Sequence, residues 1–284
     1  MILIADSGST KTDWRLVDSE SKIHQFSTQG FNPYFQSKEE ISAEIKTKLV
    51  PVCSINLGAP LTIFYYGAGC SSTNKKEIIK DALLENFPQA IIEVEHDLLA
   101  AARALCGKNS GIATILGTGS NTCYYDGEKI VQNIDSLGFI LGDEGSGAHI
   151  GKTFVAAYLN KELPQELSAR FQERFSLSKE IILENIYKKP MPNRYLASFS
   201  QFVFQQLKEQ VVFDLVADCF RQFFDKHICK YSNDKQVKIS CVGSVAFYYS
   251  NVLRLVAEEK GLVIDKILES PIAGLLLYHT NNQD

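Results

Sequence analysis

Short apolar runs alternate with longer amphipathic segments through the first hundred residues, and each apolar run ends in small or polar residues. This pattern predicts three strands over 2–5, 12–17 and 22–28, joined by turns at Asp6-Ser7-Gly8 and Asp18-Ser19-Glu20. The elements predicted after this meander are a helix over 38–48, a strand over 61–66, a helix over 74–86, a strand over 90–94 and a helix over 97–105.

The same plan restarts near residue 111. The predicted elements are, in chain order, strands over 111–116, 121–125 and 129–133, helices over 148–159 and 198–231, a strand over 237–242 and a helix over 247–260. This weak internal repeat predicts two similar α/β halves with a cleft between them, and ligands bind in such clefts.

Composition and charge indicate which kind of molecule the protein binds. The chain has 284 residues, of which 45% are hydrophobic and 22% charged, as in a soluble globular protein. A formal net charge of -4 gives no general attraction to nucleic acid or to an anionic membrane, so we expect a small-molecule partner. The chain opens without a basic leader and has no apolar stretch of membrane-spanning length, so we expect a cytoplasmic protein.

The cysteines are odd in number and scattered, without a Cys-x-x-Cys pair. We expect them to be reduced thiols that pack as small hydrophobic side chains. They are Cys53, Cys70, Cys106, Cys123, Cys219, Cys229 and Cys241.

Two turns rich in glycine and hydroxyl side chains follow buried apolar runs. The first is Asp6-Ser7-Gly8-Ser9-Thr10-Lys11-Thr12, and the second is Gly117-Thr118-Gly119-Ser120-Asn121. Glycine allows a close approach of the backbone to an anion, and Ser, Thr and Lys supply donors and positive charge, so two such turns could hold a polyphosphate. In this interpretation Asp6 lies in the hydration shell of Mg²⁺ and Lys11 offsets charge on the transferred group. The alternatives are an ordinary hairpin and a solvated lysine.

Asp97 follows the predicted strand at 90–94 and precedes an alanine-rich helix. A carboxylate at a strand end could accept the proton of a substrate hydroxyl as that hydroxyl attacks phosphorus. The simpler alternative is that Asp97 caps the helix, with His96 in a packing or supporting role.

Two later turns complete the set of candidates. In the first of them, glycines flank two acids at the start of a predicted helix: Leu141-Gly142-Asp143-Glu144-Gly145-Ser146-Gly147. The acids either contact a ligand at the helix N-terminus or complement the helix dipole. Gly243-Ser244-Val245-Ala246 is a strand-to-helix turn without a large side chain to block a flat ring.

These motifs, in this order, resemble the superfamily of sugar kinases, heat-shock ATPases and actin. More closely, the chain resembles N-acetylglucosamine kinases and their bacterial relatives in the BadF/BadG/BcrA/BcrD group. The resemblance rests on the four turns described above together with Phe31-Asn32-Pro33 and His96-Asp97, and it spans nearly the whole chain. It implies two ribonuclease H-like (actin-like ATPase) domains, one over 1–110 rejoined by a C-terminal helix at about 271–284, and one over 111–270.

The resemblance also implies roles for individual residues. Asp97 would be the base for the 6-hydroxyl of the sugar. Asn32, Gly119, Ser120 and Asp143 would bind the other hydroxyls and the acetamido group. The nucleotide would be held by Gly8, Ser9, Thr10, Lys11, Thr118, Gly243 and Ser244, with Asp6 near its magnesium.

The resulting hypothesis is an ATP- and Mg²⁺-dependent kinase that converts N-acetylglucosamine to its 6-phosphate, as a monomer or a homodimer. Glucosamine and N-acetylmuramic acid remain alternative substrates, because no motif was recognised between His149 and Ser198. Two further alternatives are a non-catalytic sugar or nucleotide sensor and an iron–sulfur ATPase activator. For the activator, Cys123 is the cysteine nearest the second phosphate turn, and the sequence shows no obvious second cysteine to ligate a cluster with it.

Overall fold

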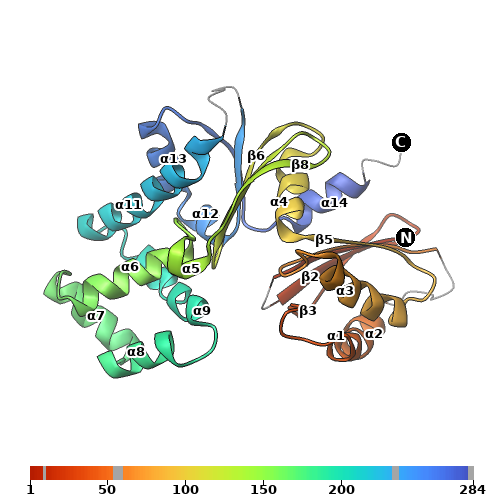
Figure 1. Ribbon diagram of the computed structural model, residues 1–284, viewed down its shortest axis with the longest axis horizontal. Helices are drawn as coiled ribbons and strands as arrows, with labels where there is room; N and C mark the ends of the chain where they lie inside the picture. Colours follow the sequence, from red (N-terminus) through yellow and green to blue (C-terminus); the bar gives the residue numbers. More distant parts are fainter. Residues whose placement is uncertain (9–10, 54–59, 232–236, 281–284) are drawn as a thin grey trace. The chain divides into compact units, whose positions relative to one another are not determined.

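The computed structural model describes residues 1–8, 11–53, 60–231 and 237–280. The chain divides into two compact units (Figure 1). Unit 1 consists of Met1–Gly107 together with Pro271–Asp284, and unit 2 consists of Lys108–Ser270.

Unit 1 is built on a five-stranded mixed sheet with the order β3-β2-β1-β4-β5. The first three strands form an antiparallel meander, and β4 and β5 run parallel to β1. The strands are β1 (Ile2–Ser7), β2 (Lys11–Val17), β3 (Ile23–Gln29), β4 (Thr62–Gly67) and β5 (Ile91–His96).

The alternation of side chains along β1 explains how helices cover both faces of this sheet. Leu3 and Ala5 pack in a cluster with residues of α1 and α3, whereas Ile2 and Ile4 pack with residues of α4 and α14. The helices of unit 1 are α1 (Lys38–Glu44), a π-helical turn (Ile45–Leu49), α2 (Val50–Cys53), α3 (Thr73–Asn86), α4 (Asp97–Cys106) and α14 (Ile272–Thr280).

Unit 2 repeats this topology, with the strand order β10-β9-β6-β7-β8. Its first three strands again form a meander, and β9 and β10 continue the sheet in parallel. The strands are β6 (Gly111–Leu116), β7 (Ser120–Tyr125), β8 (Ile130–Ile134), β9 (Ile239–Val242) and β10 (Ile264–Leu268). The predicted α/β class and the repeated plan of the two halves are therefore confirmed.

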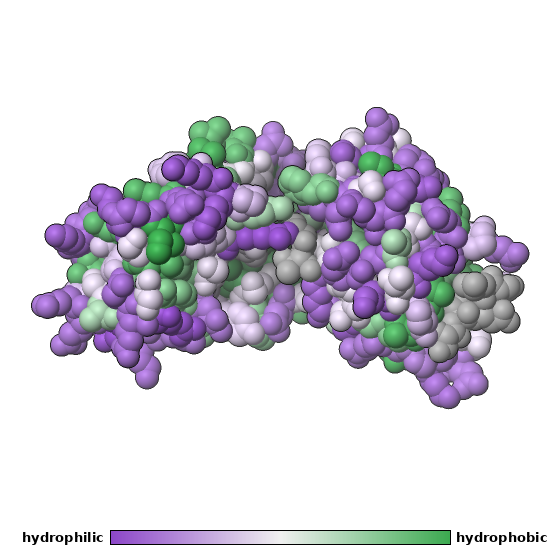
Figure 2. Space-filling view, turned by 90° about the horizontal axis from the view of Figure 1, so that it is seen from below, coloured by the Kyte–Doolittle hydropathy of each residue, from purple (hydrophilic) through white to green (hydrophobic). Residues whose placement is uncertain are grey.

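A phenylalanine-rich core joins the helices of unit 2, in which the rings of Phe154, Phe171, Phe199 and Phe202 lie 5.3–5.7 Å apart in tilted and edge contacts. The helices are α5 (Gly138–Leu141), α6 (Gly147–Leu159), α7 (Gln165–Phe175), α8 (Lys179–Tyr187), α9 (Pro192–Ala197), α10 (Ser200–Gln205), α11 (Gln210–Lys226), a 3₁₀ turn (Ile228–Lys230), α12 (Ser244–Tyr248) and α13 (Ser250–Glu259). Hydrophilic residues cover most of the visible face of each unit, with small hydrophobic groups between them (Figure 2).

The predicted single helix over 198–231 is wrong. α10 ends at Gln205, and α11 begins at Gln210 after Glu209, whose extended backbone (ψ 122°) interrupts the helical path. Helices α7, α8 and α9, and strand β10, were not predicted. Among the described residues, no helix is long and apolar enough to cross a membrane.

Candidate functional site

In unit 1 the predicted site residues lie at the edge of the sheet where β1, β4 and β5 have their carboxyl ends. Across the strands, Thr12, Ser7, Gly67 and His96 form one row of register partners. Since β1, β4 and β5 are parallel, their carboxyl ends share this edge, and Asp97 begins α4 directly after it. The first glycine turn and Asp97 therefore leave the same side of the sheet.

The first turn is fixed at its base by hydrogen bonds. The Ser7 and Thr12 hydroxyls lie 2.7 Å apart, and the Thr12 hydroxyl donates to the carbonyl of Gln29 at 3.0 Å, which leaves Ser7 as the donor to Thr12. The Phe31 amide donates to Ser7 Oγ at 3.1 Å, and the Gly8 amide donates to the Lys11 carbonyl. This network ties the turn to the segment that carries Asn32. Ser9 and Thr10 lie outside the described residues.

Acidic residues face each other where this turn begins. Asp6 on β1 and Asp13 on β2 are direct register partners, and Lys11 forms an ion pair with Asp13 at 2.7 Å. Like charges directly opposite on a sheet are unfavourable, so a cation at this end of the sheet is stabilising. The described residues contain no cluster of three or more His, Cys, Asp or Glu able to hold a metal by themselves. A carboxylate such as that of Asp6 is one of the oxygen ligands that Mg²⁺ uses, and Mg²⁺ takes few ligands from a protein and keeps waters and phosphate oxygens as the others.

Asn32 lies in a turn that its own side-chain oxygen helps to close. Its Oδ1 accepts from the Tyr34 backbone amide at 3.0 Å, and the backbone N–H of Asn32 donates to Gln36 Oε1 at 2.8 Å. Gly69, with φ +83°, passes so close that a Cβ would lie 2.6 Å from Asn32 Oδ1. A glycine is therefore required here, and the loop after β4 holds the Asn32 side chain in place.

His96, not Asp97, caps helix α4. His96 has extended backbone angles, and its Nδ1 accepts the Leu99 amide at 3.3 Å, so the expected Asp97 cap is wrong. Burial raises the pKa of Asp97 to about 6, against the opposing effect of backbone amides of Leu98 and Asp97 itself. With the helix end already capped, the Asp97 carboxyl has a pKa suited to accepting a proton near neutral pH.

In unit 2 the structure brings Gly119, Ser120 and Asp143 together. The Ser120 amide donates to Asp143 Oδ1 at 3.3 Å, and a Cβ on Gly119 would lie 3.1 Å from Asp143 Oδ2. Ser136, which was not recognised from the sequence, donates to the same Oδ1 at 2.6 Å. The Ser120 Oγ is buried without a hydrogen-bond partner among the described residues, which leaves it ready for a polar ligand.

The second glycine turn is held against the start of α6. The Gly147 and Ala148 amides donate to the carbonyls of Gly117 and Thr118 at 2.8 and 3.1 Å. Thr118 itself is exposed at the tip of the turn. The turn is thus rigid at its base and open at its tip, as a phosphate-binding hairpin requires.

Gly243 lies next to this turn and next to a pocket. Its φ is +120°, and a Cβ would lie 2.3 Å from the Leu116 carbonyl oxygen at the end of β6. The adjoining pocket has a volume of about 330 Å³ and includes Ser244. Val245, which belongs to the predicted turn, also lines it. Its other lining residues, none of which was recognised from the sequence, come from α10 and the α12 region: Ser200, Gln201, Phe204, Gln205, Tyr248 and Tyr249.

Comparison with solved structures identifies the family. A protein of Porphyromonas gingivalis described as a candidate N-acetylglucosamine kinase is 41% identical to this chain, with 100% of both chains covered and a TM-score of 0.94. The chain belongs to the N-acetylglucosamine kinase-like family. This N-acetylglucosamine kinase-like protein therefore has an actin-like ATPase fold, and the resemblance seen in the sequence is confirmed.

More distant structures share the fold alone. A candidate N-acetylglucosamine kinase of Chromobacterium violaceum is 15% identical, covers 98% of both chains and has a TM-score of 0.73. A candidate N-acetylmannosamine kinase of Listeria monocytogenes is 14% identical, covers 100% and 99% of the two chains and has a TM-score of 0.53. No protein-family model and no curated protein sequence matches the chain.

Proposed function

We propose that this protein is an ATP-dependent kinase that phosphorylates the 6-hydroxyl of N-acetylglucosamine. The observation that carries the proposal is Asp97, a carboxyl with a pKa of about 6 at the sheet edge that bears the first glycine turn. A base with this pKa is deprotonated at neutral pH and can still take a proton from an attacking hydroxyl. The 41% identity to a candidate N-acetylglucosamine kinase supports the choice of substrate class.

The residues proposed to bind the sugar occur in both units of the chain. Unit 1 supplies Asp97 as the base and Asn32 as an amide donor. Unit 2 supplies Gly119, Ser120 and Asp143, whose contacts with one another support a shared role. A site of fixed donors and acceptors discriminates strongly against sugars that lack a matching hydroxyl, because a buried polar group is then left unpaired.

The nucleotide is proposed to bind at both glycine turns and in the pocket beside Gly243. The phosphates would meet Gly8, Ser9, Thr10, Lys11 and Thr118, while the adenine would enter the pocket next to Ser244. The pocket suits a flat base because the rings of Phe204, Tyr248 and Tyr249 line it and Gln201 and Ser200 add polar groups.

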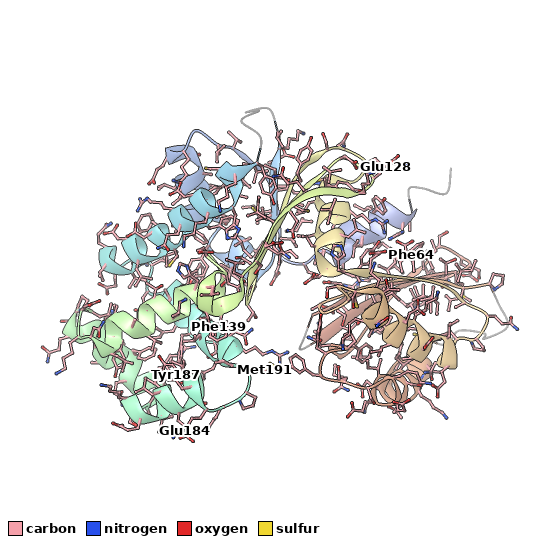
Figure 3. The ribbon with its side chains drawn as sticks, viewed as in Figure 1. Phe64, Glu128, Phe139, Glu184, Tyr187 and Met191 are labelled. Carbon is pink, nitrogen blue, oxygen red and sulfur yellow. The ribbon has the colours of Figure 1, made fainter. Side chains whose placement is uncertain are left out.

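Tyr248→Ala is expected to raise KM for ATP on the order of tenfold and to leave KM for the sugar unchanged, since it removes an aromatic wall of the base pocket. Tyr248 is half exposed, so the change should not disturb the core. Tyr187→Ala is the control, because Tyr187 lies on α8, is 80% exposed and does not line the pocket (Figure 3). Steady-state kinetics with each substrate varied in turn measures both constants, and an unchanged KM for ATP would remove the pocket from the nucleotide site.

Mg²⁺, when bound, would neutralise charge on the phosphates of the nucleotide. Asp6→Ala is expected to raise the Mg²⁺ concentration required for half-maximal nucleotide binding on the order of ten- to a hundredfold, as for groups that orient a metal's hydration shell. Calorimetry with a non-hydrolysable ATP analogue at a series of Mg²⁺ concentrations measures this without turnover. The control is Asp18→Asn, in the turn between β2 and β3, and equal Mg²⁺ dependence of Asp6→Ala and wild type would contradict the assignment.

A coupled assay of ADP release across a panel of amino sugars tests the proposed function. We expect N-acetylglucosamine to give the highest kcat/KM, ahead of glucosamine and N-acetylmuramic acid. Sugar-independent ATP hydrolysis would favour an ATPase activator, and sugar binding without ADP release would favour a sensor. The buried position of Cys123 on β7 speaks against a cluster shared through this residue between subunits.

A further inference from the structure

The turn that carries Asp143 is anchored on its other side by an ion pair whose acid, Glu144, is buried. Glu144 is 5% exposed, and its carboxylate accepts from Lys226 Nζ at 2.6 Å and from His227 Nε2 at 3.0 Å. Both partners lie at the carboxyl end of α11, more than eighty residues later in the chain. Burial alone would raise the pKa of Glu144, but the hydrogen bonds from Lys226 and His227 outweigh it and lower the pKa to about 2.

The backbone of this turn is strained and depends on outside contacts. Asp143 has φ +57° and Gly145 has φ +73°, so two of three consecutive residues are left-handed. A non-glycine residue in this region is held there by its surroundings. A Cβ on Gly145 would lie 2.8 Å from the Cβ of Phe223, which shows how closely the turn packs on α11.

The two neighbouring acids therefore have different partners. Asp143 accepts from Ser136 and from the Ser120 amide of the second glycine turn, whereas Glu144 accepts from the end of α11. His227 Nδ1 is buried without a partner among the described residues, so the only hydrogen bond that the ring makes there is the one to Glu144. The ion pair therefore anchors the residue that directly follows Asp143, while Ser136 and the Ser120 amide contact Asp143 itself.

We propose that Glu144, Lys226 and His227 form a positioning device that sets the affinity of the site for the sugar by holding Asp143 in its left-handed conformation. Glu144 acts through Asp143 and does not touch the substrate. This inference rests on the proposed function, in which Asp143 binds the sugar. If the device is broken, Asp143 is in the competent conformation for only part of the time, and the apparent Kd rises by the inverse of that fraction.

Lys226→Met tests the device with little risk to folding, because the Lys226 side chain is 53% exposed. We expect the Kd for N-acetylglucosamine and its KM to rise about tenfold, with the Kd for a non-hydrolysable ATP analogue and kcat at saturating sugar unchanged. Lys226→Arg keeps the cation and should restore most of the sugar affinity. Glu144→Gln should give a larger rise than Lys226→Met, since it weakens both hydrogen bonds of the carboxylate.

A matched control removes another ion pair of the same helix. Arg221 on α11 pairs with Glu259 on α13 at 2.8 Å, and Arg221→Met should leave the sugar Kd unchanged. A merely structural role of Lys226 would lower the melting temperature and the active fraction without changing the sugar Kd, and that result would overturn the inference. Wild-type protein that binds no amino sugar would instead overturn the proposed function, so the two failures are distinguishable.

Discussion

Asp97→Asn is expected to lower kcat by about two to four orders of magnitude, because the amide cannot take the proton of the attacking hydroxyl. Sugar and nucleotide binding should change little, since the shape of the side chain is kept. Steady-state kinetics and calorimetry on the purified variant measure the two effects separately. Retention of more than about a tenth of wild-type kcat would show that Asp97 is not the base.

The same substitution should stabilise the fold at neutral pH. The pKa of Asp97 is raised from 3.8 to about 6, so the folded protein binds the proton more tightly than the unfolded chain does. The stability that this proton contributes is complete at low pH and is lost as pH rises towards 6, which leaves a cost of up to about 3 kcal/mol at pH 7. Removing the charge in Asp97→Asn removes that cost, so its free energy of unfolding should exceed that of wild type above pH 6.

The proposed role of Asp97 as the base also predicts a pH dependence. A base must be deprotonated to act, so the logarithm of kcat should fall with unit slope below a pH of about 6 and level off above it. Asp126→Asn is the control, because Asp126 lies in an exposed turn and accepts backbone amides that lower its pKa. This control should keep wild-type activity and should not be stabilised at neutral pH. An Asp97→Asn protein less stable than wild type at pH 8 would contradict the buried charge.

Asp143→Ala is expected to lower kcat/KM for the sugar about five- to 150-fold or more. This factor corresponds to a loss of about 1 to 3 kcal/mol or more in transition-state binding. The carboxylate is 6% exposed and accepts from Ser136 and Ser120, so its removal leaves these donors and the sugar hydroxyl unpaired. The Kd of a non-hydrolysable ATP analogue should remain close to that of wild type.

Calorimetry with N-acetylglucosamine and with the ATP analogue separates the two sides of this prediction. Asn32→Ala should behave in the same way, because its amide is a proposed sugar donor on unit 1. The exposed neighbour Asp135 supplies a control, and Asp135→Ala should bind both ligands normally. Normal sugar affinity with lost nucleotide affinity in Asp143→Ala would place Asp143 on the nucleotide instead.

Local patterns in the sequence predicted the antiparallel strands of each sheet and the turns that join them. The continuous apolar run of β1, the alternation along β2 and the small residues of the two glycine turns marked the meanders. A strand covered on both faces buries successive side chains, and a tight turn needs glycine. Asp97 was also recognised from its local position, because it follows the strand predicted at 90–94 and precedes an alanine-rich helix. Its neighbour His96 was not recognised in this way, because an imidazole cap is recognised only from the 3.3 Å contact to the Leu99 amide.

Features made by contacts distant in sequence were missed. The ion pair between Glu144 and Lys226 joins residues 82 positions apart, and no local pattern marks either as the partner of the other. The pocket beside Gly243 is lined by residues of both α10 and α12. Because these helices are distant in the sequence, nothing in either segment distinguishes the aromatic residues of the pocket from ordinary helix residues. Helices α7 to α9 are short and pack into a hydrophobic core that several helices share, which periodicity over a single segment does not reveal.

In the proposed reaction, phosphate is transferred from ATP to the 6-hydroxyl of N-acetylglucosamine. Phosphorus–proton correlation NMR of the reaction mixture tests it directly, because it identifies the carbon that bears the new phosphate ester. We expect one sugar phosphate whose phosphorus couples to the two protons on carbon 6, formed in step with ADP and formed about two to four orders of magnitude more slowly by Asp97→Asn. Free phosphate without a sugar ester, or a phosphorus coupled to the single anomeric proton, would contradict it.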